Sequence, residues 1–197
     1  MAATRDRIIV ATNELFRRQG YNGTSLSQIS QASGATIGSI YHFFPGGKEA
    51  LGIAVIEATG AIYRELFEAI AAAATDPAST YRDFFTGAAE VLDSSGYLDP
   101  CPIGGIAREV ANTSEPLRQA AEAAFDSWID AARHHLTEAG VPAQQAEALA
   151  SLFVATVEGA FVLSRTQRST TALLAAGNHL SELAARAIGA APRRTRR

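Results

Sequence analysis

The stretch SLSQISQASGATIGSIYHFF, residues 25–44, decides the fold expected for this chain. It opens with the pattern S-x-x-Q, a capping box that predicts the start of a helix. Gly34 ends that short helix, and a second helix begins near Thr36. The second helix must end before Pro45, because helical geometry is unfavourable for the residue that precedes a proline. Two short helices joined by a tight turn predict a helix-turn-helix unit.

The second of these helices has the composition of a DNA-reading helix. Ile40 and Phe44 are four positions apart and should face the core, which leaves residues 36–39 at the exposed N-terminal end. Threonine and serine can hydrogen-bond to base edges, and an apolar side chain can meet a thymine methyl group. Gly38 has no side chain and permits close approach to DNA. For Ile37, a fourth core contact is the alternative.

Lys48 begins the next predicted helix, where a cation opposes the helix dipole. A bound phosphate would reverse that balance, because free backbone N–H groups and the lysine both attract it. A solvated lysine is the alternative. The Gly47-Lys48 pair does not belong to a nucleotide-binding loop, since His42 replaces its first glycine and Glu49 its serine or threonine.

The rest of the chain reads as helix. An apolar repeat predicts a first helix over 5–18. Glycines and prolines delimit six further segments, at about 48–74, 76–92, 103–110, 114–140, 142–168 and 170–188. The sequence therefore predicts an all-α protein with a three-helix head and a six-helix body. The helix-turn-helix DNA-binding domain would span 1–46, the ligand-binding and dimerisation domain 47–190, and a basic disordered tail 191–197.

Charge is unevenly distributed along the chain. The net charge is -3, yet residues 1–48 contain five basic side chains and two acidic ones. A basic head on an acidic body fits a head that binds nucleic acid, with random surface variation as the alternative.

Several classes of protein are disfavoured. The single cysteine, Cys101, allows no disulfide framework or cysteine-based zinc site. No apolar stretch of about 18 residues or signal segment is evident, so we expect a cytoplasmic protein without a membrane span. Catalytic motifs are missing, and His134-His135 is a helix-face pair rather than a metal site. We therefore expect neither an enzyme nor a bound cofactor or metal.

Large apolar and aromatic side chains gather in the body and could line a cavity for a small molecule. The expected ligand-binding residues are Ile62, Leu66, Phe67, Phe84, Phe85, Tyr97, Ile106, Asn112, Phe125, Trp128, Glu158 and Phe161. Plain core packing is the alternative for each apolar member. A carboxylate in an apolar helix needs a partner, so Glu158 could instead bond to Arg165 or Arg108.

The last two predicted helices carry wide apolar faces, which need more partner surface than one small body offers. Two such pairs from two chains would form a four-helix bundle. The expected homodimer interface contains Phe153, Val157, Leu173, Leu180 and Leu183.

A family resemblance emerges from motifs spread over about 45 residues. These are RRQGYNGTS at 17–25, Ile29, ASGA at 32–35, GSIYHFF at 38–44 and KEAL at 48–51. Together they resemble the head of the TetR family. FPGGK at 44–48, CPIGG at 101–105 and EGAF at 158–161 resemble its LmrA/YxaF-like branch.

The resemblance implies roles for individual residues. Thr36, Ile37, Gly38 and Ser39 would read bases; Tyr41 and His42 would contact phosphates; Thr24, Ser25, Ser27 and Lys48 would contact the DNA backbone. The spacer PGG before Lys48 is one residue longer than the commoner form. The resemblance further implies a ligand-responsive repressor that binds a palindromic operator as a dimer and is released by a small apolar, aromatic inducer. The alternative is a helical ligand-binding protein whose head no longer binds DNA.

Overall fold

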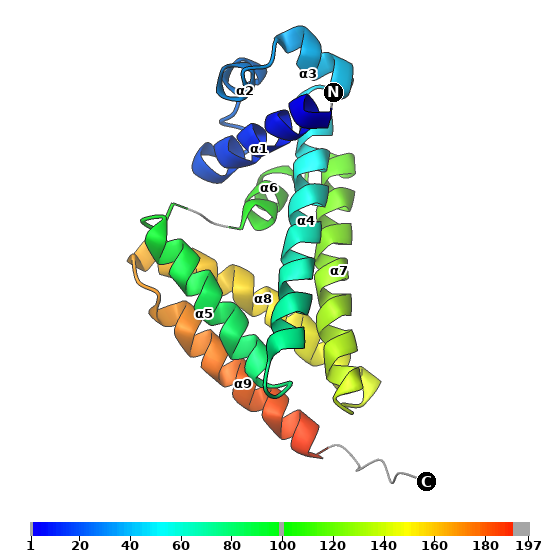
Figure 1. The fold of residues 1–197 in the computed structure, drawn as a ribbon, viewed down its shortest axis with the longest axis vertical. Helices are drawn as coiled ribbons and strands as arrows, with labels where there is room; N and C mark the ends of the chain where they lie inside the picture. Colours follow the sequence, from blue (N-terminus) through cyan, green and yellow to red (C-terminus); the bar gives the residue numbers. More distant parts are fainter. Residues whose placement is uncertain (1, 99–100, 191–197) are drawn as a thin grey trace. The chain divides into compact units, whose positions relative to one another are not determined.

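A computed structural model describes residues 2–98 and 101–190. Over these residues the chain is all-helical, as predicted, with nine helices and no strand (Figure 1). The helices are α1 (Ala2–Gln19), α2 (Leu26–Ser33), α3 (Ile37–Phe43), α4 (Lys48–Ala73), α5 (Ser79–Ser94), α6 (Pro102–Val110), α7 (Glu115–Glu138), α8 (Ala143–Gln167) and α9 (Thr171–Ala190). The tail predicted at 191–197 lies outside the described residues.

The chain divides into two compact units. The first contains residues 1–61 and 98–124, and the second contains residues 62–97 and those from 125 onward. The first unit extends beyond the head predicted at 1–46, because α6 packs against α1 and the first parts of α4 and α7 belong to the same unit.

The first unit is built on the helix-turn-helix. The predicted capping box is present: Ser25 Oγ accepts from the Gln28 amide, and the Gln28 side chain accepts from the Ser25 amide at 2.8 Å. Gly34 ends α2 in the left-handed conformation, with φ 66°. Ile40 and Phe44 are buried as predicted and share an apolar cluster with Ile8, Ile29, Ala35, Leu51 and Ala54. This cluster fixes α3 against α1, α2 and the start of α4.

The second unit has an aromatic centre. The Phe153 ring of α8 lies 5.2–5.9 Å, centroid to centroid, from the rings of Phe67, Tyr81, Phe84 and Phe85. Helix α9 packs on α5 and α8, and Gly177 allows the close approach to α5, because a Cβ there would lie 2.6 Å from the Phe85 Cβ. Arg165 Nε donates to the Tyr97 carbonyl at 3.2 Å, which joins α8 to the turn after α5.

Helix α8 is long and apolar enough, by length and composition, to cross a membrane. Glu147, Glu158 and Arg165 interrupt its apolar residues, so the helix does not contradict the sequence expectation that no unbroken apolar stretch of this length occurs. One side of the helix packs on α5 and α9, and it contributes Phe153 to the aromatic centre. The core helix of a globular domain passes the same test, so α8 is weak support for a membrane span.

The structure corrects most of the predicted dimer-interface residues. Phe153, Val157, Leu173 and Leu180 are at most 6% exposed, inside the chain's own second unit. Only Leu183 is substantially exposed, at 39%. Both helices are apolar on more than one side, so the sequence pattern alone did not distinguish the inward stripe from the outward one. The exposed side of α8 contains Leu152, Ala155, Gly159, Val162 and Leu163.

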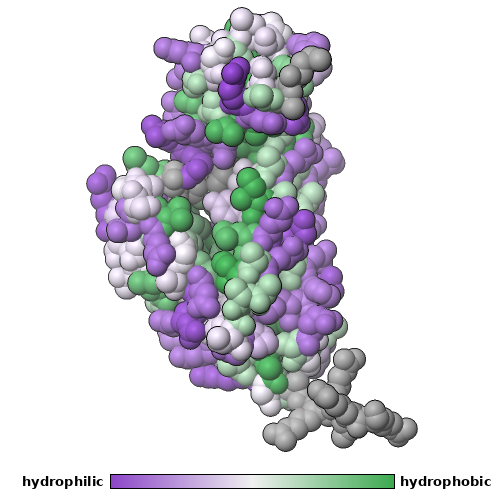
Figure 2. Space-filling model, viewed as in Figure 1, coloured by the Kyte–Doolittle hydropathy of each residue, from purple (hydrophilic) through white to green (hydrophobic). Residues whose placement is uncertain are grey.

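The surface carries both hydrophilic and apolar side chains (Figure 2). On the face drawn in Figure 2, hydrophilic side chains cover much of the surface, and apolar side chains are gathered toward the middle of the view. Large exposed apolar residues on the second unit include Ile62, Leu66, Val91 and Leu163, each at least 45% exposed. Exposed apolar area of this kind points to ligand or partner contacts when it is contiguous.

Candidate DNA-reading and ligand sites

The start of α3 is shaped by its own cap. Thr36 has extended backbone geometry, and its Oγ1 accepts from the Ser39 amide at 3.1 Å. The hydroxyl groups of Thr36 and Ser39 also lie 2.9 Å apart and share a hydrogen bond. The cap satisfies a backbone donor that would otherwise lack a partner at the helix start. It also holds both hydroxyls at the end of the helix that the sequence assigns to base reading.

Three of the four residues assigned to base reading are exposed, and the fourth, Ser39, is half-buried. Ile37 is 41% exposed, so the structure disfavours the alternative that it is a core contact. Thr36 and Gly38 are exposed, and a Cβ added at Gly38 would meet only Thr36 Oγ1, at 3.9 Å. Of the two residues assigned to phosphates, Tyr41 is 50% exposed and His42 is also exposed. Because Ile40 is fully buried, α3 cannot rotate without losing its core contact.

The turn between α1 and α2 is held by Glu109 of α6. Its carboxylate accepts from the Tyr21 amide at 3.2 Å and from the Asn22 amide at 2.7 Å. Gly20 makes this possible: its φ of 80° suits glycine, and a Cβ there would collide with the Glu109 carboxylate. Glu109 thus supplies acceptors for two amides that begin a turn. Sequence reasoning missed it, because nothing local signals a contact across almost ninety residues.

Lys48 holds the same turn from the other side. Its Nζ donates to the carbonyls of Tyr21 at 3.2 Å and Thr24 at 3.1 Å, and lies 4.5 Å from the centroid of the Tyr21 ring. Burial, and secondly the nearby carboxylate of Glu49, raise the pKa of Tyr21, so the ring stays a neutral phenol beneath the ammonium group. These contacts explain why a lysine stands at the start of α4: it stabilises the turn between α1 and α2. The sequence did not reveal this role. The predicted phosphate contact stays a prediction.

The structure corrects the assignment of Thr24 to the DNA backbone. Its side chain is 2% exposed, and its hydroxyl donates to the Gly20 carbonyl at 2.8 Å while accepting from Gln19 Nε2 at 3.2 Å. The hydroxyl therefore stabilises the turn and has no access to a phosphate in this conformation. Ser25 and Ser27 are exposed at the start of α2, as the assignment requires.

Part of the predicted ligand set forms solid core. The rings of Phe67, Phe84 and Phe85 contact one another or Phe153 directly, at centroid distances of 5.2–6.2 Å. All three are at most 9% exposed. Rings packed this closely leave no room for a ligand between them. For these residues the structure favours the core alternative.

A second aromatic group of the same unit surrounds Trp128, which is itself only 9% exposed, and includes Tyr63 of α4. The Trp128 ring lies 5.6 Å from Tyr63 and 5.4 Å from Phe125, in edge-to-face arrangements. On α4, Ile62 is 62% exposed and Leu66 45%. Helix α4 therefore carries two large exposed apolar side chains as well as the aromatic ring of Tyr63. An apolar ligand could bind to side chains of this kind.

The remaining members of the predicted set are scattered. Phe161 is buried, whereas Glu158 is half-buried with its Oε1 out of contact with solvent. The Tyr97 hydroxyl donates to Asp93 at 2.8 Å, and this bond, rather than burial or the Asp93 charge, contributes most to raising the pKa of Tyr97. In the first unit, Ile106 is buried in α6 and Asn112 is exposed after it.

Comparisons with known proteins agree with this geometry. The profile "Bacterial regulatory proteins, tetR family" matches residues 8–55, and "Transcriptional regulator LmrA/YxaF-like, C-terminal domain" matches residues 77–179. The chain belongs to the TetR family. The helix-turn-helix regulator YxaF of Bacillus subtilis is 36% identical over 87% of this chain and 90% of its own length, and LmrA of the same organism is 34% identical over 87% and 91%.

A solved structure extends the likeness to the whole fold. A TetR transcriptional regulator from Chloroflexus aurantiacus superposes with a TM-score of 0.74 at 32% identity, over 91% of this chain and 92% of its own. This TetR-family protein is thus a DNA-binding transcriptional regulator rather than an enzyme, and its C-terminal region is of the LmrA/YxaF-like type.

The turn held by Glu109 yields a prediction. Gly34→Ala places an alanine at φ 66° with open space around it and should cost about 1 kcal/mol, from backbone strain alone. Gly20→Ala adds a collision with Glu109 and should cost roughly 1–3 kcal/mol more, because the carboxylate must leave its two amides. Urea denaturation at fixed protein concentration measures both. In a Glu109→Ala background the two alanines should cost the same; an undiminished excess at Gly20 would show that the carboxylate does not hold the turn.

Proposed function

We propose that this regulator represses transcription by binding a palindromic operator as a homodimer, and that a small apolar, aromatic molecule releases it from DNA. The observation that carries the DNA-binding part is the exposed first turn of α3, held by buried Ile40. Helices of this kind place their N-terminal residues against base edges in the major groove. The excess of basic side chains in residues 1–48 supports the same orientation toward DNA.

The assignment of base and phosphate roles makes a testable distinction. Ile37→Ala should leave the free energy of unfolding within about 0.5 kcal/mol, because the side chain is exposed. It should nevertheless weaken operator binding roughly tenfold and leave binding to random duplex unchanged, because an apolar contact to a thymine methyl depends on sequence. Ser39→Ala should lower discrimination at one base-pair position by roughly 1–3 kcal/mol.

Lys48→Ala is the matched comparison. Loss of a phosphate contact should weaken binding to all DNA sequences alike. It should also reduce the slope of the logarithm of the binding constant against the logarithm of the salt concentration by about one unit, measured by fluorescence anisotropy over a salt series. If weaker binding comes with an unchanged salt slope, Lys48 acts only through the turn that it holds. Equal effects of Ile37→Ala on operator and random DNA would refute the base-reading role.

A dimer is the assembly that a palindromic operator requires, with recognition helices about one helical turn (~34 Å) apart. The exposed side of α8, with Leu152, Val162 and Leu163, offers an apolar surface beside α9. A four-helix bundle made from the α8 and α9 helices of two chains would cover it. The same side of α8 carries the small residues Ala155 and Gly159. Small residues at an interface allow two helices to approach each other closely.

The interface prediction uses exposed residues in place of the buried ones. Leu163→Glu should convert the dimer to monomer, or weaken self-association at least about tenfold, because a charge would be buried without a partner. Val91→Glu is the matched control, since Val91 is equally exposed but lies on α5. Light scattering gives the mass in each case. A monomeric wild type, or a Leu163→Glu protein that stays fully dimeric, would refute this interface.

Release by a ligand requires a difference in affinity between two conformations. A ligand that binds the DNA-competent and DNA-incompetent forms equally changes nothing, however tightly it binds. The surface around Ile62, Leu66 and the Trp128 group is the proposed site, because it combines exposed apolar side chains with aromatic edges. It lies partly on α4, whose first residue holds the α1–α2 turn.

Fluorescence of Trp128, the only tryptophan, reports on this site. Planar aromatic compounds should quench it, and Leu66→Gln should weaken their binding by roughly fivefold, because an apolar contact is replaced by a polar one. Operator DNA should weaken ligand binding by the same factor by which ligand weakens operator binding. Identical titrations with and without operator would mean that the site is not coupled to DNA. Failure of every compound in a broad panel would mean that the aromatic group is only core.

A further inference from the structure

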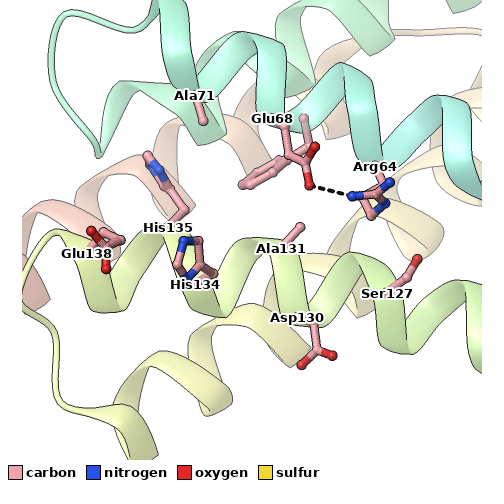
Figure 3. A pocket seen from close by; sticks show the side chains of 10 residues that line it. Arg64, Glu68, Ala71, Ser127, Asp130, Ala131, His134, His135 and Glu138 are labelled. Atoms are coloured by element: carbon pink, nitrogen blue, oxygen red, sulfur yellow. Dashed lines mark hydrogen bonds and ion pairs between the residues drawn. The ribbon is translucent and has the colours of Figure 1, made fainter.

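A groove in the second unit lies between α4 and α7 and has a volume of about 540 Å³ (Figure 3). Phe67, Ala71 and Ala131 supply its apolar lining, and Arg64, Glu68, Asp130, His134 and Glu138 are among its polar residues. This volume falls within the range of about 300–1,000 Å³ that is usual for small-molecule sites. Its lining surface is mainly apolar, so a guest could bury an apolar body there.

The groove is separate from the surface proposed for the aromatic inducer. Arg64, Glu68 and Ala71 recur at spacings of four and three, so they share one side of α4. Leu66, halfway between Arg64 and Glu68, points about 160° away from both around the helix. A molecule in the groove therefore contacts a different face of α4 from a molecule on Leu66.

The charges of the groove are unbalanced. Arg64 is its one cationic lining residue apart from the histidines, against three carboxylates, and it is engaged by Glu68 at 2.8 Å. Asp130 pairs at 2.7 Å with Arg133, which also reaches Glu147 of α8 at 3.2 Å. Glu138 is exposed and forms no ion pair with any described residue. The groove thus presents net negative charge with one uncompensated carboxylate.

His135 also lines the groove. His135 Nε2 lies 2.9 Å from the Pro77 carbonyl. Because a carbonyl only accepts hydrogen bonds, Nε2 is the donor in this contact. The His135 ring also meets Phe67 edge to face, at a centroid distance of 5.9 Å, so His135 adds an aromatic surface to the apolar part of the lining.

We propose that this α4–α7 groove binds a small organic cation with an apolar body. The apolar lining would hold the body, and the Glu138 carboxylate would attract the charge. A bare metal ion fits less well, because no three His, Cys, Asp or Glu side chains of the described chain converge as metal ligands. The assignment does not depend on the proposed inducer or on DNA binding.

Two probes of equal shape and opposite charge test the proposal. Tetraphenylphosphonium should bind the full-length protein, measured by isothermal titration calorimetry, and tetraphenylborate should bind at least tenfold more weakly, because only the charge differs. Raising the salt concentration should weaken the binding of tetraphenylphosphonium and should not weaken the binding of tetraphenylborate. Equal affinities for the two ions would overturn the proposal.

Variants then locate the site. Glu138→Gln should weaken phosphonium binding about fivefold, the effect of losing one partly exposed charge contact. Ala131→Phe should reduce it at least tenfold by filling the groove. Glu90→Gln, an exposed carboxylate on α5, and Leu66→Gln should leave it unchanged. Circular dichroism and Trp128 quenching by aromatic compounds should be the same as wild type in Ala131→Phe, which separates loss of the groove from misfolding.

Two results would overturn the assignment. Phosphonium binding that is lost in Leu66→Gln but kept in Glu138→Gln and Ala131→Phe would place the cation on the inducer surface. The chain's own segment 191–197, which contains four arginines, is the rival occupant. If a protein that ends at Ala190 binds phosphonium tenfold more tightly than the full chain, that segment fills the groove in place of a small cation.

Discussion

The turn at residues 20–24 depends on two opposite charges that reach it from elsewhere in the chain. The Glu109 carboxylate accepts from its amides, and the Lys48 ammonium donates to its carbonyls. The amide and carbonyl groups of a turn are not paired by regular secondary structure and need other hydrogen-bond partners. Here the side chains of Glu109 and Lys48 provide them. Because the turn leads directly into α2, and the α2–α3 pair shares its core with α1, the orientation of the reading helix follows from it. Within the first unit, α6 therefore helps to position the helix-turn-helix through Glu109.

Packing in the second unit shows how an apolar helix can serve two surfaces. Phe153 closes an aromatic centre with α4 and α5, which uses one side of α8. The opposite side is left with Leu152, Val162 and Leu163 exposed. This exposed apolar side is the surface that the proposed dimer would cover. The buried stripe stabilises the fold, and the exposed one is available for assembly.

Two faces of α4 would carry different ligands under these proposals. One face presents the exposed side chain of Leu66, and another lines a groove of net negative charge with α7. An apolar ligand on the first or a cation on the second would bias the conformations of this helix only if it bound one of them more tightly. The size of any effect on DNA is set by the difference in ligand affinity between conformations, not by affinity itself.

The sequence alone determined the class of protein and the outline of its reading head. The capping box at Ser25, the left-handed Gly34 and the spacing of Ile40 and Phe44 are local signals, because caps, turns and helix faces depend on residues within four positions of one another. The motifs of residues 17–51 also sufficed to indicate the family. Tertiary structure decided what depends on distant residues. It paired Glu109 with the α1–α2 turn, turned Thr24 inward, and placed Phe153 in the core instead of at an interface. Helical periodicity shows which residues share a face, but only the packing of other helices determines whether that face is buried within the chain or left for a partner.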